Sequence, residues 1–172
     1  MSAVQEALDF FTKNDFATIV ARIREHNVPG LVQFAVYGIF GTLSTVIYTG
    51  VSLFLSYKVI PAIGGMMVNG APITDSHRAK NALINNCIAF FIANIFAYTT
   101  NVLFVFKQGL HGPVVEFLLF TAGSGTSFLL SQFAGPYLIK RYGMRTQMAL
   151  VTNVIASMLM NFVIRKFIVF KG

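Results

Sequence analysis

Four long stretches of apolar residues divide the chain. They cover roughly Leu31–Ser56, Leu83–Phe106, Val114–Leu138 and Met148–Phe170. Each stretch has at least the ~20 residues that a tilted helix needs to cross about 30 Å of hydrocarbon. A span must satisfy its own backbone hydrogen bonds, and none of the stretches alternates polar and apolar residues as a barrel strand does. The pattern therefore predicts an all-α membrane protein with four transmembrane helices.

The first 30 residues carry a shorter, amphipathic pattern. In the segment "NDFATIVARIREH", helical spacing places a group of apolar residues on one face: Phe16, Ile19, Val20 and Ile23. Asn14 or Asp15 can begin this helix, and Pro29-Gly30 can end it. The segment is either a helix that lies in the membrane interface or a cytosolic helix packed on loops. Acidic residues interrupt it too often for a signal peptide. We expect an amphipathic N-terminal segment, 1–30, before a transmembrane domain, 31–172.

The second and fourth apolar stretches end in nearly the same way. The motif "NVLFVFK" closes the second stretch and "KFIVFK" closes the fourth. Aligning Phe106 with Phe170 brings Asn101 opposite Arg165. Each copy ends an apolar run with aromatic residues and a lysine. The pattern predicts that the four spans are two tandem two-helix repeats.

The beginnings of the two halves also match loosely. Gln33-Phe34 opens the first half and Glu116-Phe117 opens the second. The first half is longer, and its extra residues fall in the loop "YKVIPAIGGMMVNGAPITDSHRAKN", which could lie on the outer membrane surface and cover a site. A two-span repeat returns to its starting side, so the two halves should share one orientation. Their pseudo-two-fold axis would lie along the membrane normal, and the interface between the halves is a natural place for a substrate path.

Four spans in two halves, with "TNVLFVFK" and "MNFVIRKFIVFK" at the ends of the second and fourth, resemble the GtrA-like family of small membrane proteins. The resemblance covers about Val32 to Lys171. It implies work with polyprenyl-phosphate-linked sugars in the assembly of cell-surface glycans. The protein would move a polyprenyl phosphate, or the sugar attached to it, across the bilayer. Alternatively, it would be a non-transporting subunit that anchors a glycosyltransferase or supplies its substrate.

Polar residues recur inside the second and fourth stretches. Helical spacing places Asn94, Tyr98 and Asn101 on one face of the second, and Asn161 and Arg165 on one face of the fourth. Amide side chains in lipid need partners, so these faces should point inward. These side chains could form hydrogen bonds between helices, worth ~0.6 kcal/mol each in measured cases, or they could bind a ligand. Both interpretations are open at this point.

Two basic residues precede the final motif, Arg165 and Lys166. Near the end of a span, either side chain could reach the headgroup layer by snorkelling. Alternatively, Arg165 offers a planar fork of donors that suits phosphate oxygens, and beside Asn161 and Asn101 it would form a polar pocket at headgroup depth. The predicted binding residues for the lipid phosphate or sugar are Arg165, Asn161, Asn101, Lys166, Asn94 and Tyr98. Lys166 points about 100° away from Arg165 and serves as an internal comparison.

Composition and charge narrow the class of protein. Hydrophobic residues make up 55% of the chain and charged residues only 11%, against about 25% in a soluble domain. The net charge of +7 could indicate nucleic acid, but the basic residues flank the apolar stretches, where they meet anionic headgroups. We find no catalytic triad, metal-ligand spacing or phosphate-binding loop, and expect neither an enzyme nor a cofactor or metal. Glu116 is the only acid at a span edge, and no carboxylate falls clearly inside a span, which disfavours a proton-coupled small-molecule exporter.

Charge bias does not decide the orientation. The 13 basic residues divide seven against six between the two sides. The family resemblance implies that both termini of this multi-pass protein of the inner (plasma) membrane lie in the cytoplasm. The expected partners are the polyprenyl-phosphate lipid or its glycosyl derivative, a glycosyltransferase, and further copies of the chain. A dimer or larger oligomer is expected because four spans of this size make a thin enclosure.

Overall fold

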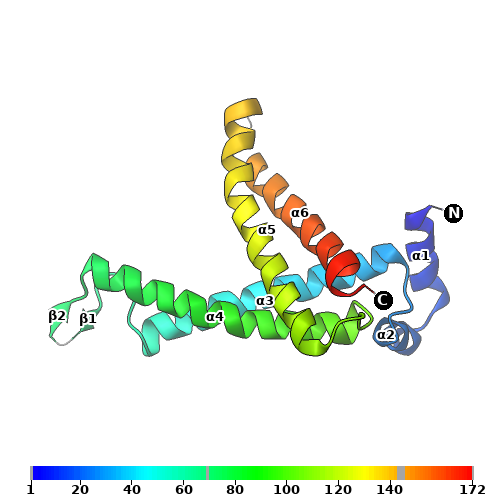
Figure 1. The fold of residues 1–172 in the computed structure, drawn as a ribbon, viewed down its shortest axis with the longest axis horizontal. Helices are drawn as coiled ribbons and strands as arrows, with labels where there is room; N and C mark the ends of the chain where they lie inside the picture. Colours follow the sequence, from blue (N-terminus) through cyan, green and yellow to red (C-terminus); the bar gives the residue numbers. More distant parts are fainter. Residues whose placement is uncertain (1, 69, 143–145, 172) are drawn as a thin grey trace. The chain divides into compact units, whose positions relative to one another are not determined.

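The computed structural model describes residues 2–68, 70–142 and 146–171, and within them the side chains of all but 127–140, 146–151, 153 and 154. Helices dominate the described residues (Figure 1), so the all-α prediction is confirmed. In order, the elements are α1 (Ala3–Lys13), α2 (Phe16–Arg24), α3 (Gly30–Lys58), β1 (Met67–Val68), β2 (Ala71–Pro72), α4 (Asp75–Phe104), α5 (Pro113–Tyr142), α6 (Thr146–Ile164) and a π-helical turn, η1 (Arg165–Val169).

The N-terminal segment contains two helices where the sequence predicts one. The side chain of Ser2 accepts a hydrogen bond from the backbone of Gln5, and the side chain of Gln5 bonds back to Ser2, so a capping box begins α1. Asp15 caps α2 as predicted, and hydrogen bonds from Thr18 hold the pKa of the Asp15 carboxyl below its usual value. α2 stops at Arg24, earlier than the predicted end at Pro29-Gly30. His26 has φ 57°, in the left-handed region, where a right-handed helix cannot continue.

The two long helices α3 and α4 coincide with the first two predicted spans. Both have the length and apolar composition needed to cross a membrane. α4 begins at Asp75, well before the predicted Leu83, because Thr74 accepts a hydrogen bond from the backbone of His77 and so caps a polar first turn. α5 and the α6–η1 segment occupy the third and fourth predicted stretches and lie side by side. The four-span repeat stays a prediction.

The structure divides into two compact units, which are described separately. Unit 1 comprises Met1–Gly38 with Asn101–Gly172, and unit 2 comprises Ile39–Thr100. In unit 2, α3 and α4 pack closely, because the buried face of α4 carries the small residues Ala89, Ala93 and Ala97. The hydroxyl of Ser44 donates to the carbonyl of Ala93 at 3.0 Å across this contact.

The loop between α3 and α4 is fixed to one face of α4. The side chain of Asn81 donates to the carbonyl of Pro61 at 2.7 Å, and Gly64 lies directly under the guanidinium of Arg78. Asn85 is fully buried and donates to both the hydroxyl of Ser56 and the carbonyl of Ile60, each at 2.9 Å. Asn85 therefore joins α4 to α3 by a hydrogen bond and also holds the loop between them.

We expect Asn85→Ala to lower the free energy of unfolding by about 1–3 kcal/mol, because it leaves the buried hydroxyl of Ser56 and a loop carbonyl without their donor. Denaturant unfolding in detergent, followed by circular dichroism, measures the change. The neighbouring Asn86 is exposed and accepts from Ser52, so Asn86→Ala should change stability by less than about 0.5 kcal/mol. Equal losses in the two variants would contradict a special role for the buried amide.

Candidate functional site

Unit 1 brings four helical segments together through contacts between side chains and helix ends. Near the start of α3, the side chain of Gln33 donates to the carbonyl of Val105, just beyond α4, at 2.6 Å. His26 lies 3.1 Å from the carbonyl of Val102, in the last turn of α4. Residues of α5 and η1 complete the group. The terminal carbonyls of α4, which have no partner within the helix, are thereby satisfied.

Aromatic residues fill the centre of unit 1. Phe106 and Phe170, the matching residues of the repeated motif, stack with their ring centroids 5.1 Å apart and their planes 14° apart. Phe162 lies 5.5 Å from Phe106 and 5.4 Å from Tyr37, and Phe120 lies 6.3 Å from Phe170. We call these five residues the aromatic cluster. Such ring pairs stabilise beyond the area they bury.

The two copies of the motif also end in the same backbone turn. The amide of Phe106 donates to the carbonyl of Asn101, and the amide of Phe170 donates to the carbonyl of Arg165, both at 2.8 Å. Each bond joins residues five apart and closes the end of a helical segment, as the bonds from Asn27 to Arg22 and from Ile60 to Leu55 do at the ends of α2 and α3. The alignment of Asn101 with Arg165 therefore has a local structural counterpart.

Arg165 is buried against the aromatic cluster, with only 8% of its surface exposed. Its terminal nitrogens donate to the hydroxyls of Tyr37, at 3.1 Å, and Ser124, at 2.9 Å. The guanidinium carbon lies 3.8 Å from the centroid of the Phe120 ring and 5.2 Å from that of Tyr37. Cation–π contacts of this kind compensate part of the cost of burying the charge. The side chain does not snorkel to the surface.

The charge of Arg165 is not fully compensated by the part of the chain that the structure describes. No described carboxylate forms an ion pair with it, and its Nε has no acceptor there. The hydroxyl of Tyr37 accepts from Arg165, and we find no described acceptor for its own hydrogen. An unpaired buried charge costs several kcal/mol. Two unused donors beside a buried cation suit an anionic ligand.

Lys166 also turns inward, on a different side of η1. Its ammonium donates to the side-chain oxygen of Gln33 at 3.0 Å and lies 5.5 Å from the centroid of Phe162. Gln33 in turn donates to Val105, so this lysine is held in a satisfied network. Lys166 is therefore a suitable comparison for Arg165.

The predicted binding residues fall in both units. Unit 1 holds Arg165, Lys166, Asn161 and Asn101, and unit 2 holds Asn94 and Tyr98. Asn101 and Asn94 are buried, and Asn161 and Tyr98 are partly exposed. The sequence pattern predicts that Asn161 and Asn101 lie beside Arg165 in a polar pocket, and that contact stays a prediction.

Sequence reasoning missed two hydrogen-bonding partners of Arg165. Tyr37 lies one turn after Gln33, and Ser124 lies in the small-residue run "TAGSGTS". Spacing along one helix gives no information about contacts between α3, α5 and η1. A polar residue in each of these helices was the only available signal.

The sequence does not predict the burial of Glu116. This residue lies in the first turn of α5, at the predicted span edge, but it is completely buried, and its carboxylate accepts a hydrogen bond from the backbone of Gly109 at 2.7 Å. The linker before α5 folds over it, because the amide of Leu110 donates to the carbonyl of Lys171 and Gly109 packs on the backbone of Phe170. Any side chain at Gly109 would approach that backbone within 3.0 Å. The chain therefore does contain a buried carboxylate.

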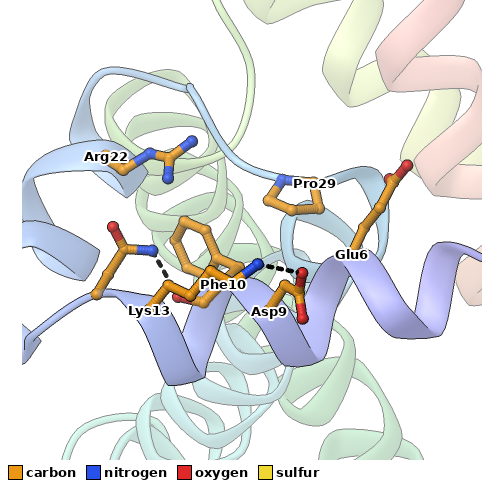
Figure 2. A pocket seen from close by; sticks show the side chains of 7 residues that line it. Glu6, Asp9, Phe10, Lys13, Arg22 and Pro29 are labelled. Carbon is orange, nitrogen blue, oxygen red and sulfur yellow. Dashed lines mark hydrogen bonds and ion pairs between the residues drawn. The ribbon is translucent and has the colours of Figure 1, made fainter. Parts of the chain in front are cut away.

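A separate hollow of about 410 Å³ lies beside α1 (Figure 2). Its lining residues are Glu6, Asp9, Phe10, Lys13, Asn14, Arg22 and Pro29. Lys13 pairs with Asp9 at 2.6 Å, Asn14 bonds to the carbonyl of Phe10, and Arg22 lies over the Phe10 ring. The hollow is open, Lys13 and Asp9 pair with each other, and Arg22 stacks on Phe10, so Arg165 is the stronger candidate for ligand binding.

The family model for the GtrA/DPMS transmembrane domain matches residues 33–170, a range that includes the whole aromatic cluster, Arg165 and both copies of the motif. No curated protein and no solved structure matches the chain. The match and the apolar helices α3 and α4 identify a membrane protein, and the family indicates involvement in the handling of polyprenyl-linked sugars for glycans. The chain belongs to the GtrA/DPMS transmembrane domain family.

Proposed function

We propose that this protein binds a polyprenyl phosphate, or a sugar linked to it, at Arg165 and moves it across the membrane. The observation that supports this most is the buried guanidinium of Arg165, which has neither an ion pair to a carboxylate nor an acceptor for its Nε–H among the described residues. Phosphate oxygens are acceptors that carry the compensating charge. No bond of the lipid needs to break, so the activity is transport rather than catalysis.

The surroundings of Arg165 suit both parts of such a lipid. Nε of Arg165 and the hydroxyl of Tyr37 can donate to phosphate oxygens, and the buried side-chain oxygens of Asn161 and Asn101 could accept from sugar hydroxyls. The aromatic cluster would give the polyprenyl chain an apolar wall. An interior site of this kind strengthens each charged hydrogen bond, because little water screens it.

The proposed architecture has four spans, with α5 and α6–η1 as the third and fourth. The ends of α4 and η1 and the start of α3 would then lie on the cytoplasmic side of the plasma membrane, where a lipid-linked donor is made. Both termini would lie there as well, and the protein would act as a dimer or larger oligomer. A non-transporting subunit would bind the same lipid for a glycosyltransferase without moving it.

We expect Arg165→Ala to weaken the binding of polyprenyl phosphate about a hundredfold or more, since loss of one member of a buried charged pair commonly costs ~3–5 kcal/mol. Arg165→Lys keeps the charge but loses the planar fork, and should recover only part of the affinity. Dissociation constants in nanodiscs measure both. Lys166→Ala is the matched control and should change affinity little. Equal losses at the two positions would indicate a diffuse basic rim, and an unchanged affinity at Arg165 would rule out this site.

Transport is tested separately from binding. In vesicles that contain only the purified protein, a labelled polyprenyl phosphate should cross between leaflets much faster than in empty vesicles. Arg165→Ala vesicles should resemble the empty ones because the site no longer holds the headgroup. Binding without acceleration of transbilayer movement would favour the non-transporting subunit over the transporter.

A third measurement distinguishes a ligand-binding arginine from a structural one. In the triple variant Arg165→Met with Tyr37→Phe and Ser124→Ala, the guanidinium and both of its hydroxyl partners become apolar, so the free energy of unfolding should stay the same or rise. If Arg165 served only to stabilise the fold, the free energy of unfolding should fall instead. Phe120→Ala truncates a fully buried ring and should lower the free energy of unfolding by about 3–5 kcal/mol. This variant shows that the assay can detect a loss of stability in unit 1.

A further inference from the structure

α1 is packed against unit 1 on one side and leaves apolar side chains open on the other. Ala7 and Phe10 are its buried residues. Val4, Leu8 and Phe11 are 57%, 59% and 53% exposed. Their spacing of four and three residues places these three side chains on one face of the helix. We call them the α1 stripe.

The helix that carries the α1 stripe is well specified, although it has only 11 residues. Helices of this length are marginal in water unless something supports them. The capping box between Ser2 and Gln5 supports the first turn. The ion pair between Lys13 and Asp9, one turn apart at 2.6 Å, supports the last. Asp9 and Lys13 lie on the face opposite the α1 stripe, so α1 is amphipathic as well as capped.

α1 lies beside the point where α3 begins. Phe10 and Pro29 line the same hollow (Figure 2), and Pro29 directly precedes α3. α3 has 29 residues and measures about 43 Å, more than the ~30 Å of hydrocarbon in a bilayer. The chain is a membrane protein and α3 is its first candidate span, so the start of α3 lies close to the membrane surface. α1 is therefore held beside the headgroup layer.

α2 adds to the open apolar surface. None of its residues, all of which the structure describes, is buried. Phe16 is 82% exposed and Val20 is 38% exposed. Both helices precede residues 33–170, the range of the family domain, so this surface is a feature of the present chain and not of the family match.

Net charge does not attract this segment to a membrane. Of the 13 basic residues of the chain, only three precede α3, whereas four of the six acidic residues do: Lys13, Arg22 and Arg24 against Glu6, Asp9, Asp15 and Glu25. An anionic lipid surface attracts segments with an excess of basic residues. The α1 stripe therefore offers apolar area without electrostatic attraction.

We propose that α1 lies on the membrane surface with the α1 stripe inserted at the boundary between headgroups and acyl chains, where it anchors the start of α3. Helices of this kind bury their apolar face about 5–10 Å into that boundary. The occupant of the stripe is the lipid because α3 already holds α1 beside it. Attachment to a span makes the contact intramolecular, so a small apolar stripe is sufficient. This inference requires only that α3 crosses the membrane, and it is independent of lipid phosphate binding at Arg165.

The chain contains no tryptophan, so a single introduced tryptophan reports on one position alone. Leu8→Trp and Phe11→Trp place the reporter in the α1 stripe. Glu6→Trp is the matched control because Glu6 is exposed and lies about 200° around the helix from Leu8. Each full-length variant is reconstituted in phosphatidylcholine vesicles. Brominated acyl chains in part of the lipid quench tryptophan within the bilayer, and acrylamide quenches tryptophan in water.

We expect brominated lipid to remove most of the fluorescence of Leu8→Trp and Phe11→Trp and little of that of Glu6→Trp. Acrylamide should give the reverse order. The results should be the same when the vesicles also contain anionic phosphatidylglycerol, because net charge does not hold α1 on the surface.

A second measurement keeps the reporter constant and removes the rest of the α1 stripe. Val4→Trp should be quenched by brominated lipid in the otherwise unchanged chain. With Leu8→Ser and Phe11→Ser added, the same tryptophan should become accessible to acrylamide. All three positions are exposed, so these changes leave the buried contacts of Ala7 and Phe10 in place.

Three outcomes would overturn the inference. Quenching of the α1 stripe by acrylamide instead of brominated lipid would mean that it faces water. Protection from both quenchers would mean that protein covers it, such as a second copy of the chain. Quenching by brominated lipid that requires phosphatidylglycerol would mean that charge holds α1. Polyprenyl-phosphate binding, measured on the same variants, tests the site at Arg165 separately.

Discussion

The guanidinium of Arg165 is the constraint on which unit 1 depends. A cation can stay inside an apolar unit only where its donors have acceptors and its faces have aromatic neighbours. Tyr37, Ser124 and Phe120 supply these from two different helices, so α3 and α5 must approach η1 closely. Small residues allow that approach. A side-chain carbon at Gly38 would lie 2.6 Å from Met158, and one at Gly123 would lie 3.0 Å from Ile164.

The sequence predicts the helices well because the signal is local. A run of apolar residues long enough to cross a bilayer has few alternatives to a helix, and α3 and α4 lie where such runs occur. Phe106 and Phe170, which the alignment matches as equivalent positions, also stack on each other, a contact that the alignment does not predict. α1 was missed because its apolar stripe is short and interrupted by acids, although the Ser2–Gln5 capping box was visible in the sequence.

The surroundings of Arg165 and Glu116 could not be predicted in the same way. Whether a charged residue near the end of a span reaches water or turns inward depends on what other helices place beside it. For Arg165 the deciding residues, Tyr37 and Ser124, are far away in the chain. Glu116 is buried because the linker before α5, which contains Gly109, packs against it. The composition of that linker is typical of an exposed loop.

A duplicated pair of helices starts with two equivalent positions for every side chain, yet a transporter of an anion benefits from one binding centre. The carbonyls of Asn101 and Arg165, which the alignment of the two motifs matches, accept the same kind of backbone hydrogen bond, while one side chain is an amide and the other a cation. A cation alone would have destabilised the interior. Gln33 and Glu116, which open the two matched stretches, differ in a similar way, because the first is an amide and the second is a buried carboxylate. The buried charged residues that the structure describes, Arg165 and Glu116, therefore both lie in the second of the two matched stretches, whereas the residues matched to them in the first are amides.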